Sequence, residues 1–157
     1  MKIGFKSFDK LICYFWLMLA NLPMPGHWRW RVVKLAKIKF NLPIDKSKKT
    51  FVFIGRNVVF DSMYPEDIEI GNYVHITNGC VLLTHYLNTN VGGVKWEHGK
   101  IIIEDGAFLG ANTIITKPCK IGRNSIVGAG SVVTKDIPPY EVWAGNPAKF
   151  IKNIEKK

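Results

Sequence analysis

The second half of the chain repeats a pattern of hydrophobic and polar positions every six residues. This period fits neither an α-helix nor a simple alternating strand, so it predicts a short strand and a turn, repeated along the chain. The first position of each unit is aliphatic and keeps one frame, at Ile103, Leu109, Ile115, Ile121, Val127 and Val133. The fifth position is mostly small, at Ala107, Thr113, Cys119, Ser125, Ser131 and Ile137.

Three such units predict a triangular coil of about eighteen residues, with the first and fifth positions pointing inward. Stacked coils would pair as parallel strands about 4.8 Å apart. Turns rich in Gly and Asn allow the positive φ that the corners need. The same period occurs earlier, at Ile70, Ile76 and Leu82. The pattern predicts an all-β solenoid of hexapeptide repeats over residues 51–138, but the period alone does not fix its handedness.

Two interruptions divide this pattern. The frame slips between residues 54 and 70, near Pro65. The second break falls in residues 88–100, because Leu82 and Ile103 are 21 positions apart, which is not a multiple of six. A polar, Gly-containing insertion in a solenoid is expected to project from one face as a loop, and such loops often carry function.

The two ends of the chain show other patterns. Apolar residues at helical spacing predict a helix over residues 1–22, ended by the Pro- and Gly-containing stretch that follows. Residues 28–40 mix helical and alternating patterns, and both structures stay open there. The apolar face of the first helix consists of Phe5, Phe8, Ile12, Phe15 and Leu19. At the other end of the chain we expect a short helix from Ile151 to Lys157.

A length of 157 residues favours one domain with its own core. We divide the chain into a helical, basic segment over residues 1–50 that packs on the solenoid, the solenoid over 51–138, and a C-terminal extension over 139–157. An odd number of cysteines without framework spacing favours a reducing compartment. Cys80 and Cys119 stand at the small inward position, so we expect them to be packed rather than reactive.

Positive charge is concentrated at the start of the chain. The net charge is +10, and residues 1–50 hold eleven basic and two acidic residues, which leaves only +1 for the remainder. A basic segment beside a near-neutral one indicates a surface partner. The apolar run over residues 11–20 is too short to span a bilayer, and Met18 makes a poor signal-peptide cleavage site. We therefore expect a cytoplasmic protein.

Two roles stay open for residues 1–40. The apolar helix face is expected to cap the open end of the solenoid. Capping does not explain the basic run that follows, which is punctuated by Trp28 and Trp30. Such a segment can lie against the inner face of the cytoplasmic membrane, since cations attract anionic lipid and Trp favours the headgroup level. The cations are Arg29, Arg31, Lys34, Lys37 and Lys39.

Residues 110–154 read GANTIITKPCKIGRNSIVGAGSVVTKDIPPYEVWAGNPAKFIKNI. This string closely resembles the C-terminal coils of hexapeptide-repeat acyltransferases, in particular maltose and galactoside acetyltransferases and the O-acetyltransferases of polysaccharide clusters. The resemblance covers residues 51–154, and residues 1–50 only in general character. It implies a left-handed parallel β-helix and a homotrimer that binds acetyl-CoA in a groove between two subunits.

We expect His85 to be the catalytic base. It stands at the outward-facing fourth position of its unit, directly before the predicted loop. An imidazole titrates near neutrality, so it could take a proton from an acceptor hydroxyl that attacks a thioester. In the acyltransferases that the chain resembles, a histidine at the matching place is that base. The sequence offers no obvious acid to orient the ring, and a backbone carbonyl could do so.

The resemblance also implies where the donor and the acceptor bind. Lys149 and Lys152 fall where basic residues approach the adenosine phosphates. Arg is common at the position of Lys149, and a lysine there cannot make the bidentate phosphate contact that an arginine makes. Asn57 and Asp61 fall near acceptor-binding positions, although an ordinary turn Asn and a capping Asp are the competing explanation. The pantetheine path is implied for Gly110, Ala111, Ala129, Thr134 and Lys135, where tight coil packing is the competing explanation.

The predicted function is transfer of an acetyl group from acetyl-CoA to a hydroxyl of a sugar or polysaccharide precursor. Transfer to the amine of an amino sugar or xenobiotic is the main alternative. A γ-class carbonic anhydrase of the same fold would need three metal-binding histidines, but His75, His85 and His98 lack the close spacing of such a site. A non-catalytic scaffold is a further alternative. We expect a small-molecule or glycan acceptor, no bound metal and no nucleic-acid partner.

Overall fold

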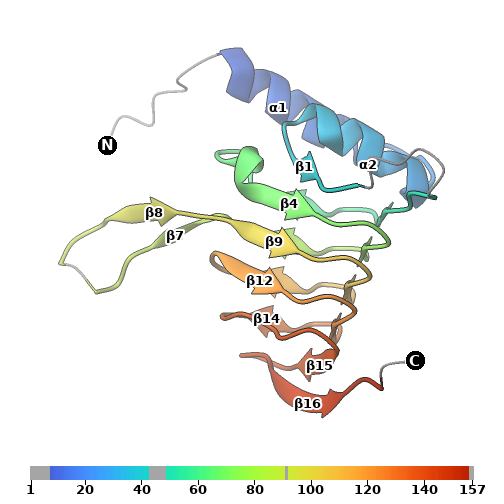
Figure 1. The fold of residues 1–157 in the computed structure, drawn as a ribbon. Coiled ribbons are helices and arrows are strands. Elements are labelled where there is room, and N and C mark those ends of the chain that lie inside the picture. The colour runs from blue at the N-terminus through green and yellow to red at the C-terminus, as the bar shows by residue number, and fades with distance from the viewer. Residues whose placement is uncertain (1–7, 43–48, 91, 156–157) are drawn as a thin grey trace.

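The computed structural model describes residues 8–42, 49–90 and 92–155. Short strands form a stack of coils, and two helices lie together at the end of the stack that is farthest from the C-terminus (Figure 1). The helices are α1 (Phe8–Leu19) and α2 (Gly26–Leu35). The residues that could be helix or strand therefore divide between α2 and a strand, β1 (Lys39–Phe40).

Three sheets, parallel apart from the pairing of the last strand, form the sides of the stack. Sheet A contains β1, β4 (Ile68–Ile70), β9 (Ile101–Ile103) and β12 (Cys119–Ile121). Sheet B contains β2 (Phe53–Ile54), β5 (His75–Ile76), β10 (Phe108–Leu109), β13 (Ile126–Val127), β15 (Glu141–Ala144) and β16 (Lys149–Asn153). Sheet C contains β3 (Val59–Phe60), β6 (Val81–Leu82), β11 (Ile114–Ile115) and β14 (Val132–Val133).

The chain passes through sheets A, B and C in turn and then begins the next coil. The predicted repeat of short parallel strands is confirmed. Neighbouring coils are in register, so that the inward-facing residues of successive strands stack on one another. The strand pairs bury an aliphatic column at the centre: Ile54, Ile70, Ile76, Leu82, Ile103, Leu109, Ile115, Ile121, Val127 and Val133.

The small fifth positions are buried as predicted, and their hydroxyls have partners. Thr113 and Ser125 donate to the carbonyl three residues earlier, at 2.7 and 2.6 Å. Ser131 donates to Gly128 in the same way, at 2.6 Å. Each hydroxyl therefore satisfies a carbonyl at a corner, which removes the cost of burying either group alone.

Both interruptions of the repeat lie at the corner where the chain leaves sheet C for sheet A. Paired residues in sheet C are 22 apart between β3 and β6 and 33 apart between β6 and β11, against 18 in the regular coil that follows. The first surplus forms a turn with the 3₁₀ helix η1 (Pro65–Asp67). The second forms the antiparallel hairpin of β7 (His85–Leu87) and β8 (Trp96–His98), which extends away from the stack (Figure 1).

The helical cap does not use the predicted face. Ile12 and Phe15 are exposed, whereas Cys13 and Ala20 are buried. The expectation that the large apolar residues of the first helix cap the solenoid is therefore wrong for these two, because α1 turns Cys13 and Leu17 toward the core instead. Leu19 is half-buried, while Phe5 and the Phe8 side chain lie outside the described residues.

A buried guanidinium fastens the two helices to the first coil. Arg29 of α2 donates to the carbonyls of Ala20 at 2.5 Å, Ile54 at 2.6 Å and Met24 at 2.9 Å. These carbonyls belong to the end of α1, to strand β2 and to the linker between the helices. Because an arginine fork can serve several acceptors at once, one side chain fixes the position of the cap.

The expected C-terminal helix is wrong. Residues 149–153 instead form β16, antiparallel to β15, after a turn in which Gly145 adopts a φ of 103°. Strand β15 would otherwise leave its backbone N–H and C=O groups unpaired at the edge of sheet B. Pairing with β16 satisfies those groups, and this requirement is not visible in the local sequence.

Candidate functional site

His85 lies at the corner between sheets C and A, at the start of the hairpin. It follows β6 and Thr84, and its register partner across the hairpin is His98. The ring is partly exposed, as expected for an outward-facing fourth position. The hairpin is braced on its other face, where Glu97 accepts hydrogen bonds from Tyr86 at 3.1 Å and Asn88 at 2.9 Å.

Asp61 holds the His85 ring. Its carboxylate oxygen Oδ2 makes a short contact with Nδ1 of His85 and also accepts from the backbone N–H of His85 at 3.1 Å. The same oxygen accepts from the backbone N–H and the hydroxyl of Thr84, at 2.9 and 2.8 Å. Its second oxygen, Oδ1, accepts from the N–H of Met63 at 2.8 Å. Both carboxylate oxygens are thus occupied within the chain, and the residue is only 3% exposed.

Parallel pairing explains why these residues meet. Asp61 follows β3, Thr84 and His85 follow β6, and the two strands pair through Phe60 and Leu82. The residues after each strand therefore arrive at the same corner, one coil apart. The sequence left open which group orients His85, and the structure places the carboxylate of Asp61 against the ring. The coil between β3 and β6 has four extra residues, so counting in units of six did not align Asp61 with His85.

The charge of Asp61 is maintained in spite of its burial. Burial alone would raise the pKa of this carboxyl, but hydrogen bonds from Met63, Thr84 and His85 outweigh it and hold the pKa below its ordinary value. An ionised carboxylate only accepts hydrogen bonds, so Nδ1 of His85 donates. The other ring nitrogen, Nε2, then carries the lone pair that a base needs.

Aromatic side chains surround the pair. The ring of Trp96 lies 5.5 Å from that of His85, and this tryptophan is 52% exposed. His98 contacts Asp67 through Nδ1 at 2.7 Å. Tyr64 stacks on His98 with ring centroids 3.9 Å apart. No pattern in the sequence indicated these contacts, because Tyr64 and Asp67 lie in the first insertion and Trp96 and His98 in the second.

The predicted donor residues lie mainly along the two edges of sheet C. Gly110 and Ala111 follow β10 and Ala129 follows β13, at the corner between sheets B and C, where Asn57 also lies. Thr134 and Lys135 follow β14 at the opposite corner, on the same side as His85. Gly110 has a structural reason of its own, since a Cβ there would come within 2.4 Å of the Ala129 nitrogen.

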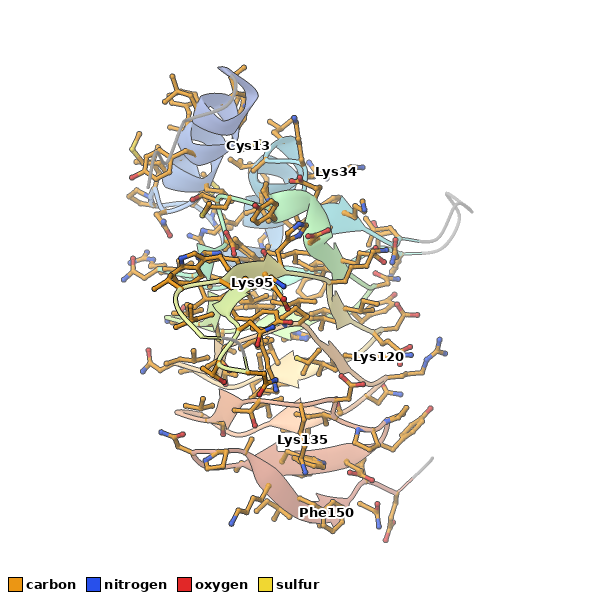
Figure 2. All side chains as sticks on the ribbon, turned by 90° about the vertical axis from the view of Figure 1, so that its left-hand side faces the viewer. Cys13, Lys34, Lys95, Lys120, Lys135 and Phe150 are labelled. Atoms are coloured by element: carbon orange, nitrogen blue, oxygen red, sulfur yellow. The ribbon has the colours of Figure 1, made fainter. Side chains whose placement is uncertain are left out.

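The remaining predicted cations lie near the end of the stack opposite the helices. Lys149 and Lys152 are exposed on β16. Lys135 places its ammonium 5.1 Å from the ring of Trp143. Figure 2 shows Lys135 well below Lys95, the residue that precedes β8 of the hairpin. One chain thus brings Asp61 to His85, but it leaves Asn57, Gly110, Ala111 and Ala129 at another corner.

The described residues contain no group of three or more His, Cys, Asp or Glu that could hold a metal ion. His75 lies on sheet B among Phe51, Phe53 and Phe108, away from the corner of His85 and His98. Both inward cysteines are buried as predicted. Burial raises the pKa of Cys80 and, for Cys119, raises the pKa to about 12, so both thiols stay protonated.

Comparison with known proteins finds similarity to transferases. Residues 100–135 match the family described as bacterial transferase hexapeptide (six repeats). A 2,3,4,5-tetrahydropyridine-2,6-dicarboxylate N-acetyltransferase of Clostridium perfringens is 52% identical over 56 residues, covering 36% of this chain and 24% of the relative. The chain spans 18–31% of the length of the first curated relatives that it matches.

Two solved structures are similar over nearly the whole chain. A hexapeptide-repeat acetyltransferase of Vibrio cholerae, in complex with acetyl-CoA, has a TM-score of 0.71 and 21% identity, with 94% of this chain and 88% of that chain covered. A maltose O-acetyltransferase of Clostridium difficile has a TM-score of 0.61 and 27% identity, with coverages of 94% and 87%. The predicted resemblance to hexapeptide-repeat acyltransferases is confirmed.

Proposed function

We propose that this protein transfers an acetyl group from acetyl-CoA to a hydroxyl of a sugar or polysaccharide precursor, with His85 as the general base. The observation that carries the proposal is the Asp61–His85 pair at an exposed corner. The similarity to a maltose O-acetyltransferase supports the acceptor class, and the similarity to an acetyltransferase in complex with acetyl-CoA supports the donor.

The proposed reaction moves one proton twice. Nε2 of His85 removes the proton of the acceptor hydroxyl while that oxygen attacks the thioester carbonyl carbon. The carbon–sulfur bond then breaks, and the imidazolium returns the proton to the departing sulfur, which leaves an ester and free CoA. Asp61 stays ionised, fixes the tautomer of the ring and stabilises the imidazolium between the two transfers.

Trp96 is the acceptor contact that the geometry favours. An exposed indole beside the base offers a flat apolar face, and the C–H groups of one side of a pyranose ring suit the negative face of an aromatic ring. Asp61 was predicted to bind the acceptor directly, but its occupied oxygens favour the orienting role. Asn57 lies at the other edge of sheet C, so we propose that it reaches an acceptor only in a neighbouring subunit's site.

We further propose a homotrimer with left-handed coils. The left-handedness rests on the resemblance alone. The general rule for parallel crossovers is right-handed and would favour the opposite hand. The trimer is supported by the outward positions of two sheets, which form apolar columns, while sheet A carries ion pairs such as Lys100–Glu69 at 2.7 Å. The column on sheet C is Val59, Val81, Ile114 and Val132. The column on sheet B is Phe53, His75, Phe108, Ile126 and Val142.

A trimer would also complete the donor site. Small residues on one edge of sheet C leave room for an extended pantetheine arm, through Gly110, Ala111 and Ala129. Thr134 and Lys135 would continue that path, and Lys149 and Lys152 would approach the phosphates. We propose that transfer takes place in the cytoplasm, at the inner face of the membrane. Among the described residues, no helix has the length and apolar character needed to cross a membrane.

Transfer to an amine is the second candidate, because the chain also matches an N-acetyltransferase. Purified protein, acetyl-CoA and a panel of sugars, amino sugars and nucleotide sugars would separate the two: base-labile ester products identify O-transfer and stable amides identify N-transfer. His85→Ala should lower turnover by about 10²–10⁴-fold and leave CoA binding by calorimetry intact. His27→Ala is the matched control. A product from no acceptor, or full turnover without His85, would overturn the proposal.

A further inference from the structure

The outward face of α1 is large, apolar and uncovered. Cys13 of α1 and Ala20 just after it are buried and Leu17 packs against the core, whereas bulky side chains on the other side of the helix are exposed. The spacing of the outward residues follows the helix period and places them on one face. Between 48% and 57% of each of these residues is exposed: Leu11, Tyr14, Phe15 and Met18. Leu22, just after the end of the helix, is 51% exposed.

This face lacks the charged residues that a solvated helix carries. Residues 11–22 contain no Asp, Glu, Lys or Arg. A helix that is apolar on every side is normally covered on every side, and an exposed apolar patch of this kind marks an interaction surface. The described part of the chain covers only the inner side of α1.

Basic and aromatic residues border the apolar face. On the adjoining α2, Trp28 and Leu35 are exposed, and so are the side chains of Arg31 and Lys34. Figure 2 shows Lys34 at the same end of the molecule as Cys13 of α1. Residues 11–42 contain five basic residues and no acidic one. The surface therefore combines apolar bulk, an exposed indole and positive charge, which suits an anionic lipid surface.

We infer that the outward face of α1, together with Trp28, Arg31 and Lys34 of α2, binds the surface of an anionic membrane with the helices lying flat on it. We call this surface the helical face. A second copy of the chain is a poorer occupant, because two helical faces in contact would bring like charges together with no acid from residues 11–42 between them. A membrane supplies both the apolar layer and the anionic groups.

The helical face also lies close to the candidate site. The hairpin of His85 leaves the stack in the half that carries the helices, whereas β15 and β16 lie at the far end (Figure 1). Binding by the helical face would hold the site near the lipid headgroups. An acceptor attached to a lipid would then meet His85 without leaving the membrane, a consequence that rests on the proposed function, whereas the binding itself does not.

The test is co-sedimentation of the full chain with vesicles of phosphatidylcholine, with and without phosphatidylglycerol. Binding should rise with phosphatidylglycerol and fall with salt. Phe15→Ser together with Met18→Ser should weaken binding at least tenfold, because both side chains lose the apolar area that they would bury. Lys34→Gln should weaken it about fivefold, and Lys117→Gln, an exposed lysine outside this surface, should leave it unchanged.

Circular dichroism and light scattering of each variant complete the experiment. If the serine variant fails to fold, the Lys34→Gln and Lys117→Gln pair still decides the role of charge. Absence of binding to any vesicle would overturn the inference. A smaller oligomer for the serine variant, without any loss of vesicle binding, would also overturn the inference, because the helical face would then join copies of the chain. Turnover on a soluble acceptor, measured in parallel, reports on the proposed function separately.

Discussion

Replacing Asp61 with asparagine removes the charge of this side chain and keeps its size. In the native site, Oδ2 faces Nδ1 of His85, the Thr84 hydroxyl and two backbone N–H groups. All of these groups donate, and an amide can offer only one accepting oxygen in the same space. The amide of the Asp61→Asn variant must therefore either present its NH₂ to a donor or leave a donor without a partner.

The first outcome predicts a loss of turnover, and the second predicts a loss of stability. If the amide NH₂ faces His85, the ring must accept at Nδ1 and carry its proton on Nε2, the atom that should act as the base. We expect turnover to fall by about 10²–10⁴-fold, with the KM for acetyl-CoA nearly unchanged. Hydrogen bonds to a charged group contribute about 1.5–3 kcal/mol each. Part of this is recovered by the amide oxygen, so we expect the free energy of unfolding to fall by about 2–3 kcal/mol.

Three measurements check this reasoning. Steady-state kinetics gives turnover and KM, urea unfolding gives the stability, and ¹⁵N chemical shifts of the His85 ring give the tautomer. Asp105→Asn is the matched control, since Asp105 also accepts a hydrogen bond from a backbone N–H, that of Asn72 at 2.8 Å, but lies at the corner between sheets A and B. An Asp61→Asn enzyme with near-normal turnover, or with an unchanged His85 tautomer, would refute the orienting role.

Three further predictions use other features of the site and the fold. Hydrogen bonds hold the pKa of Asp61 below its ordinary value, so its stabilising contribution should be complete above about pH 4 and disappear as the pH falls through the lowered pKa. The difference in the free energy of unfolding between the protein and the Asp61→Asn variant, measured by urea unfolding, should therefore vanish in acid. Trp96→Ala should raise the KM for a sugar acceptor about tenfold, because the loss of the ring contact costs roughly 1–2 kcal/mol. CoA binding, measured by calorimetry, should stay unchanged. An unchanged KM would exclude Trp96 as the contact for the sugar ring. Light scattering should give about three times the chain mass of 17.8 kDa, and Ile114→Lys should lower that mass if the apolar column of sheet C joins the subunits.

The regular part of the fold could be predicted because its rule is local. Each coil repeats the same relation between an aliphatic residue and a small residue, so residues 103–133 indicate the stack, its inward side chains and its corners without further information. The two ends follow no such rule. Whether Ile151 and its neighbours form a helix or a strand depends on the open edge of β15, which lies outside the local sequence. Likewise, α1 is apolar on both sides, so its pattern did not show which side faces the core.

The candidate site is least visible in the sequence because it is built where the repeat fails. The two insertions looked unrelated, since their surplus lengths differ and neither is a multiple of six. Register shows that both leave the stack at the corner between sheets C and A, on consecutive coils. The first insertion and its approach supply Asp61, Tyr64 and Asp67, and the second supplies His85, Trp96 and His98. Regular positions in the stack are mostly occupied by packing, whereas residues in or next to the insertions at one corner are free to approach each other and a substrate. In a repeat of this kind, insertions that fall at the same corner of adjacent coils are therefore the first place to look for a site, once the strands have been paired.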